Sequence, residues 1–215
     1  MRRRKDKVPW WLILLLILNL LIRIIPQEWI IGEAPTAENV RQQTEAWIAE
    51  QTEPAADILQ DEIRWLSLSD REKVRILERL AGEQAASLGL RKHIDVKVVE
   101  LADNLAGQYD DRTGTIEIDA ECFESYRPEK LAYVVCHEVR HAYQFALADA
   151  WTNLCADSRY ADLELFDVME ECYEGLNNYC HASEDLEMYR NQWVEIDARE
   201  YADEEITCIW LKKDK

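Results

Sequence analysis

The most distinct pattern in the chain is a run of apolar residues near its start. Residues 8–22 would be apolar on every face of a helix, interrupted only by Asn19. A helix from Trp11 to Trp29 would rise roughly 27 Å, close to the hydrocarbon thickness of a bilayer. Tryptophan at both ends is typical of membrane interfaces. The pattern predicts a transmembrane anchor over residues 8–25.

Two other interpretations of this segment are less favoured. A cleaved signal peptide would need a small-x-small cleavage site after the apolar run, and none follows it. A buried core helix would rarely have a strongly basic flank and no polar face. Residues 1–7 are therefore expected to form a basic tail before the anchor, and residues 26–35 a linker after it.

Beyond the linker, helical periodicity gives way to strand alternation and then returns. The predicted elements are helices at 36–51, 54–66 and 69–88, strands at 94–98, 107–109 and 115–119, and helices at 127–151, 162–179 and from 183 nearly to the end. This order predicts an α+β fold with a small antiparallel sheet. We assign residues 36–90 to a helical N-terminal part of the domain and residues 91–215 to its core.

The charge of the chain divides unevenly between its start and the rest. The formal net charge is −18, from 43 acidic and 25 basic residues. Residues 1–25 carry +5, so the remainder carries −23. This balance disfavours nucleic-acid binding, because the body would repel a phosphate backbone. With the positive-inside rule, it predicts a single-pass membrane protein with a cytoplasmic N-terminus and an extracytoplasmic domain.

The cysteines leave the redox state of the protein open. They are even in number, and none lies in the predicted anchor: Cys122, Cys136, Cys155, Cys172, Cys180 and Cys208. Outside the cytoplasm such a set favours disulfides, and inside it these residues would be free thiols. No CxxC pair is present, so a structural zinc ribbon is not supported.

The candidate chemistry lies in the long predicted helix at 127–151. It contains an HExxH motif, formed by His137, Glu138 and His141. Residues four apart share one face of a helix, so both imidazoles can reach one ion. Glu138 projects from the adjacent side, where it can accept a proton from a metal-bound water without being a ligand. The motif predicts a bound divalent metal and a catalytic carboxylate.

The surroundings of this motif resemble a known family. From Gly107 to Gln144, a hairpin followed by the HExxH helix is similar to the zincin metallopeptidases. Residues 195–202 resemble the glutamate helix of the gluzincins, and the compact layout is most similar to the small ImmA/IrrE-like proteases. The resemblance implies a zincin-like (minigluzincin) domain, Zn²⁺ as cofactor and Glu195 as the third metal ligand. It also implies that Ile116, Glu117 and Ile118 form an edge strand along which an extended peptide aligns.

Other third ligands and one departure from the family accompany this resemblance. Glu170, Glu171 and Glu184 are alternative acidic ligands. The metzincin pattern is excluded, because the sequence after His141 lacks its glycine and third histidine. Arg199 stands where the family has an Asp or Asn that orients a zinc-binding histidine. An arginine cannot accept that proton, so another group must do so, or Arg199 pairs with an acid.

Further side chains are candidates for contacting the reacting groups. Tyr143, Tyr179, Tyr189 and His181 could each donate a hydrogen bond to an oxyanion, and each could equally be a packing residue. The sequence as a whole predicts a membrane-anchored zinc metalloendopeptidase. Its partners would be a peptide or protein substrate and, through residues 8–25, the bilayer. The alternative is a non-catalytic, metal-stabilised membrane receptor or regulator on a zincin-like scaffold.

Overall fold

The computed structural model describes residues 53–101, 105–154 and 164–211, all within one compact unit, Glu53–Lys215. The predicted tail, anchor, linker and first helix lie outside these residues. No helix within the described ranges is long and apolar enough to cross a bilayer. The prediction of a single-pass membrane protein with an N-terminal transmembrane helix therefore finds no support. We withdraw it.

Within residues 53–94, three helices precede the sheet: α4 (Ala55–Leu59), α5 (Glu62–Ser67) and α6 (Asp70–Ser87). The helix predicted at 54–66 is broken at Asp61, whose side chain accepts a hydrogen bond from the backbone of Arg64 and so starts α5. A capping box begins α6, since the side chains of Ser69 and Glu72 each accept a hydrogen bond from the other's backbone N–H. Gly89, at φ 77°, closes α6 in the left-handed conformation.

The sheet is mixed rather than antiparallel. Its strands β1 (Asp95–Val99), β2 (Gly107–Asp110) and β3 (Thr115–Asp119) lie in the order β1-β3-β2. β2 pairs antiparallel with β3, but β1 pairs parallel with it. After β1, the chain forms β2 at the opposite edge of the sheet. A hairpin then connects β2 to β3, which lies between the other two strands. The prediction of an antiparallel sheet is therefore wrong.

The same topology corrects the predicted edge strand. Ile116, Glu117 and Ile118 lie in the central strand β3, whose backbone is paired on both sides. Ile116 and Ile118 are fully buried beneath the helices. No backbone edge of β3 is left for an added peptide. The edge next to the HExxH helix belongs to β2 instead.

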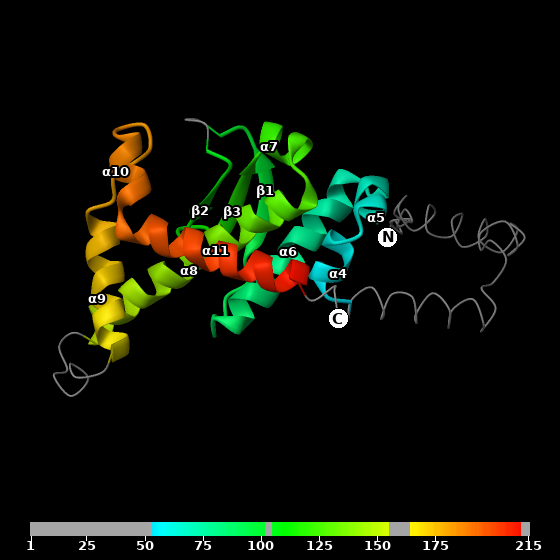
Figure 1. The fold of residues 1–215 in the computed structure, drawn as a ribbon. Coiled ribbons are helices and arrows are strands. Elements are labelled where there is room, and N and C mark those ends of the chain that lie inside the picture. Colours follow the sequence, from blue (N-terminus) through cyan, green and yellow to red (C-terminus); the bar gives the residue numbers. More distant parts are fainter. Residues whose placement is uncertain (1–52, 102–104, 155–163, 212–215) are drawn as a thin grey trace, which may run out of the picture. The chain divides into compact units, whose positions relative to one another are not determined.

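In the described part of the chain, the sheet is followed by five helices: α7 (Ala120–Ser125), α8 (Pro128–Leu154), α9 (Glu164–Asn177), α10 (Leu186–Asn191) and α11 (Trp193–Leu211). α8 is the central helix, and α6, α9, α11 and the sheet all pack against it (Figure 1). The helix predicted from residue 183 is divided at Gln192, whose extended backbone separates α10 from α11.

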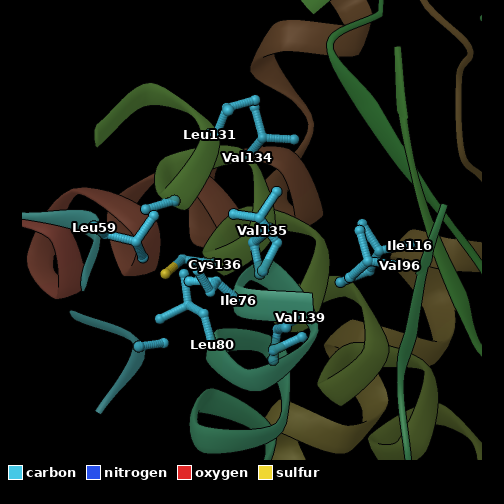
Figure 2. Close-up of a cluster of buried hydrophobic side chains, with 14 of the residues drawn as sticks. Leu59, Ile76, Leu80, Val96, Ile116, Leu131, Val134, Val135, Cys136 and Val139 are labelled. Atoms are coloured by element: carbon cyan, nitrogen blue, oxygen red, sulfur yellow. The ribbon is translucent and has the colours of Figure 1, made fainter. Parts of the chain in front are cut away.

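The main hydrophobic core lies where α8 meets α4, α6 and the sheet (Figure 2). Its buried side chains include Leu59, Ile76, Leu80, Val96, Ile116, Leu131, Val135, Cys136 and Val139. Cys136 is completely buried in this core and is therefore a packing residue. A smaller cluster around Phe166, Met169 and Cys172 joins α9 to the C-terminal half of α8. Both ends of α8 are thus anchored, and its middle turn carries the site.

Candidate metal centre

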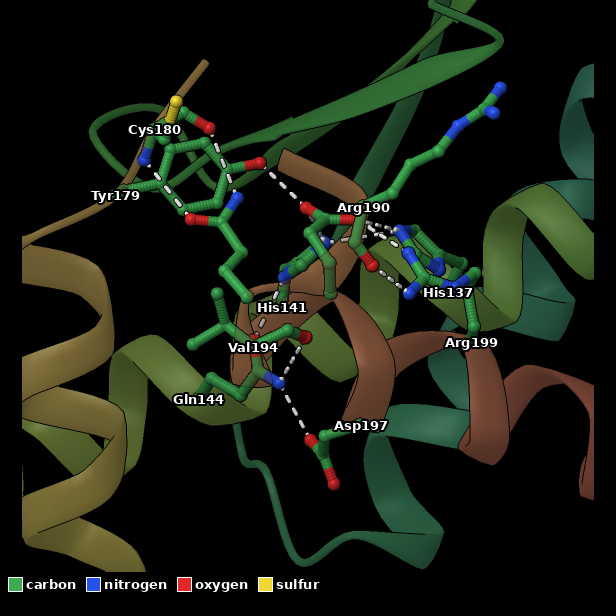
Figure 3. A network of polar contacts seen from close by, with 11 residues as sticks. His137, His141, Gln144, Tyr179, Cys180, Arg190, Val194, Asp197 and Arg199 are labelled. Carbon is green, nitrogen blue, oxygen red and sulfur yellow. Dashed lines mark hydrogen bonds and ion pairs between the residues drawn. The ribbon is translucent and has the colours of Figure 1, made fainter. Parts of the chain in front are cut away.

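Three ligand-type side chains meet where α8 crosses α11 (Figure 3). His137 and His141 lie one turn apart on α8, and their Nε2 atoms are 3.1 Å from each other. Glu195, in the first turn of α11, places its Oε2 3.3 Å from Nε2 of His137 and its Oε1 3.3 Å from Nε2 of His141. One potential ligand atom from each residue lies within 4.8 Å of the others. The group could therefore bind a metal ion.

Burial and charge at Glu195 fit a cation. The residue is completely buried. Burial alone would raise the pKa of its carboxyl, but hydrogen bonds and charge from His137 and His141 outweigh it and hold that pKa well below its ordinary value. Its Oε2 has no hydrogen-bond partner despite being buried. A buried carboxylate oxygen without a hydrogen-bond partner costs folding free energy unless a cation binds to it.

The alternative acidic ligands do not join this group. Glu170 and Glu171 are exposed on α9. Glu184 instead accepts a hydrogen bond from the backbone N–H of His181 at 3.1 Å. Among the described residues, only His137, His141 and Glu195 form a cluster that could hold a metal.

His141 is held in orientation by Gln144, a residue that the sequence analysis did not single out. Nδ1 of His141 lies 2.8 Å from Oε1 of Gln144, which is itself completely buried. The amide nitrogen of Gln144 donates to the carbonyl of Val194 at 2.9 Å and to Asp197 at 2.6 Å. Both of these partners can only accept, so Oε1 must face the histidine and accept its Nδ1–H. Nε2 of His141 is then directed at Glu195 and His137 and is the nitrogen that could bind a metal.

An ion pair holds the hydrogen-bond acceptor of Gln144 in place. Arg140 binds Asp197 with two hydrogen bonds, of 2.8 Å and 2.7 Å. Each side chain is 19% exposed, so the pair is largely shielded from solvent. The bidentate geometry fixes the Asp197 carboxylate that accepts from Gln144. A continuous set of polar contacts therefore runs from Arg140 to His141.

Arg199 does not orient either histidine. Its Nη1 lies 3.8 Å from Oε2 of Glu195, and its Nη2 donates to the backbone carbonyl of Arg190 at the end of α10. Of the two outcomes considered for this residue, pairing with an acid is the one found. The second histidine has no equivalent of Gln144, because the buried Nδ1 of His137 has no hydrogen-bond partner.

Glu138 lies beside the cluster without belonging to it. The side chain is buried, and its Oε1 is 3.4 Å from the position that a Cβ on Gly107 would occupy. Burial raises the pKa of this carboxyl, while the charges of His137 and His141 act in the opposite direction. A buried carboxyl with a raised pKa, beside three potential metal ligands and against the edge strand β2, could act as a general base.

The structure separates the candidate oxyanion donors. Tyr179 donates to Oε1 of Glu195 at 2.6 Å, and its ring centroid is 6.1 Å from that of Tyr189 on α10. The ring centroid of His181 is 5.2 Å from that of Tyr179, and both side chains line a cavity of about 740 Å³. Tyr143 is not at the site, because its ring packs with the smaller hydrophobic cluster and against the guanidinium of Arg140.

Two cavities adjoin both the cluster and Glu138. One, of about 740 Å³, extends from β2 to Tyr179 and includes Glu138, His141 and Glu195 in its lining. The other, of about 590 Å³, includes Glu138 and His137 in its lining.

Comparison of the chain with family models, curated proteins and solved structures finds no significant match.

Proposed function

We propose that this protein is a zinc-dependent hydrolase of peptide bonds. The observation that carries the proposal is the placement of Glu138. It lies next to a buried His137–His141–Glu195 group but outside it, and it faces both cavities. A purely structural metal site would need the three ligands but would give no reason for a further buried carboxyl beside them.

The spacing of the ligand atoms supports zinc. Ligand atoms bound tetrahedrally to one zinc ion at its usual bond lengths are roughly 3.3 Å apart. The two Nε2 atoms are 3.1 Å apart, and a different oxygen of Glu195 lies 3.3 Å from each of them. Two imidazoles and one carboxylate also leave a fourth position open, as in catalytic zinc sites. When bound, zinc would supply Lewis acidity and lower the pKa of a coordinated water.

The chain itself would supply proton transfer and positioning. Glu138 would take a proton from the attacking water and pass it to the leaving nitrogen of the substrate. Tyr179 and Tyr189 both line the larger cavity, and burial raises the pKa of each, so both remain hydrogen-bond donors at neutral pH. They are the candidates to stabilise the developing oxyanion.

Strand β2 would align the substrate. Its backbone forms the free edge of the sheet on the side of α8, and Gly107 lines both cavities. An extended peptide can add to such an edge through main-chain hydrogen bonds. A glycine is required at this point, because a Cβ on Gly107 would lie only 2.6 Å from Cγ1 of Val134.

Substitution of Glu138 tests the proposal. Glu138→Gln keeps the shape of the side chain and removes the base, so zinc content should stay at one per chain. Cleavage of a mixed peptide library, followed by mass spectrometry, should fall by at least about 100-fold. Glu129→Gln makes the same change at an exposed position in the first turn of α8 and should cleave like wild type.

The opposite outcome is equally clear. Zinc-loaded wild type that cleaves no peptide at any pH would end the peptidase proposal. The metal centre would then belong to the non-catalytic alternative, a metal-stabilised regulator.

A further inference from the structure

The loop between α9 and α10, residues 178–185, is joined to the start of α11 by the side chain of Gln192. The backbone N–H of Cys180 donates to Oε1 of Gln192, and Nε2 of Gln192 donates to the carbonyl of Cys180, both at 3.0 Å. The orientation of the amide follows from its partners, because a backbone N–H can only donate and a carbonyl can only accept. Two hydrogen bonds to one backbone position fix where Cys180 lies relative to Gln192.

The backbone of Gln192 begins the helix that carries the acidic member of the metal centre. Its carbonyl accepts hydrogen bonds from the N–H groups of Glu195 and Ile196, each at 3.1 Å. Its own N–H donates to the carbonyl of Met188 at 3.0 Å and so closes α10. The position of Gln192 relative to Glu195 is therefore set by the first turn of α11.

The residue before Cys180 contacts the metal centre. The hydroxyl of Tyr179 donates to Oε1 of Glu195 at 2.6 Å (Figure 3). The other carboxylate oxygen, Oε2, is buried without a hydrogen-bond partner and lies 3.3 Å from Nε2 of His137. A hydroxyl bound to Oε1 opposes rotation of the carboxylate, so Oε2 stays directed toward the histidine. Tyr179 thus orients Glu195 as an outer partner orients a metal ligand.

Other hydrogen bonds of the loop shape it without attaching it to α11. The N–H groups of Glu184 and Asp185 donate to the carbonyl of His181 at 2.9 and 3.2 Å, and Oε2 of Glu184 accepts from the N–H of His181. Within the described part of the chain, only Tyr179 and Cys180 of this loop form hydrogen bonds to Gln192 or to α11. Loss of the amide at Gln192 would leave the loop attached there by the tyrosine alone.

We propose that Gln192 is a positioning residue of the metal centre. By binding both backbone groups of Cys180, its side chain keeps the hydroxyl of Tyr179 on Glu195, and Glu195 keeps the orientation in which it can bind a metal. The inference rests on the zinc site of the proposed function, and it does not depend on catalysis.

Zinc affinity gives a readout that needs no substrate. Tyr179→Phe removes the hydroxyl, so zinc affinity should fall about tenfold, the lower end of the range for loss of an outer partner. Gln192→Met keeps the length of the side chain without its polar groups and should lower the affinity about five- to tenfold. Competition with a chromogenic chelator measures both losses. Asn178→Ala removes a hydrogen bond at an exposed position of the same loop and should bind zinc like wild type.

The double variant separates positioning from a general loss of structure. If Gln192 acts through Tyr179, adding Gln192→Met to Tyr179→Phe should change zinc affinity by less than about twofold. Gln192→Glu keeps an acceptor for the N–H of Cys180 but has no donor for its carbonyl, so its affinity should lie between those of Gln192→Met and wild type. Urea denaturation of each variant shows whether it is folded under the conditions of the titration.

Losses that multiply in the double variant would overturn the proposal, because Gln192 would then affect zinc independently of Tyr179. Wild-type affinity in Gln192→Met would overturn it as well. Neither result requires cleavage of a peptide. The peptidase proposal fails separately, if zinc-loaded wild type cleaves no member of the mixed library.

Discussion

The two histidines of the metal centre have very different surroundings. His141 faces the inner side of the site, where Gln144 and the Arg140–Asp197 pair satisfy one another's hydrogen bonds. His137 faces the outer side, where its Nδ1 has no partner and two cavities reach it. The larger cavity also reaches His141, so both histidines border open space while one of them is rigidly supported. A catalytic metal site needs both properties, because its ligands must stay fixed while a substrate enters.

The largest loss of zinc affinity is expected from substitution of Glu195, which contacts both histidines. Glu195→Ala deletes the only acidic member of the cluster, so zinc affinity should fall by more than the about 100-fold that marks the loss of an outer partner. Titration with zinc in competition with a chromogenic chelator measures this. Glu171→Ala, an exposed acidic residue on α9, serves as the control and should bind zinc normally. Unchanged affinity in Glu195→Ala would place the third ligand elsewhere.

The next largest loss of zinc affinity is expected from substitution of Gln144, which orients His141. Gln144→Met keeps the volume but cannot accept the Nδ1–H of His141, so zinc affinity should fall about 10- to 100-fold. Val194 and Asp197 also lose a donor, so the free energy of unfolding should fall by about 1–3 kcal/mol. Chelator competition and urea denaturation measure the two effects.

A second substitution at this position separates orientation from packing. Gln144→Glu restores an acceptor for His141 but places a carboxyl beside Asp197. It should therefore bind zinc more tightly than Gln144→Met while remaining less stable than wild type. If both variants bind zinc like wild type, the orientation of His141 does not depend on Gln144.

The smallest change in zinc affinity is expected from substitution of Arg199, on the side of His137. Arg199→Gln removes a 3.8 Å ion pair with Glu195, which is too long to contribute much, so zinc affinity should change by less than about fivefold. The contact with the carbonyl of Arg190 is lost as well. Hydrogen exchange should therefore become faster in α10 and remain unchanged in α8. A loss of zinc affinity as large as that of Gln144→Met would remove the distinction between the two sides.

The sequence predicted the ligands better than the structures that support them. A helix brings residues four apart onto one face whatever surrounds it, so the pairing of His137 with His141 followed from spacing alone. Glu195 came from a resemblance, and the structure brings it to both histidines. Gln144 also had a local signal, being three residues after His141 on the same helix. Its role depends on Val194 and Asp197, which only tertiary packing brings near.

The strand order was beyond the reach of a local pattern. Alternation identifies the two faces of β3 but not its neighbours, and those neighbours decide whether Ile116–Ile118 is central or at an edge. The break between α10 and α11 is likewise set by local caps at Asp185 and Gln192 within a stretch that is helical in periodicity on both sides. The structure thus places β3 at the centre of the sheet and leaves the edge next to α8 to β2.

X-ray absorption spectroscopy at the zinc edge of the purified protein tests the central claim most directly. The account predicts one zinc per chain with two imidazole nitrogens and oxygen ligands at about 2.0–2.2 Å. In Glu195→Ala, the same measurement should show both imidazoles lost or the oxygen shell changed. Sulfur ligands, imidazole-free coordination, or a protein that does not retain zinc would contradict a metal centre at His137, His141 and Glu195.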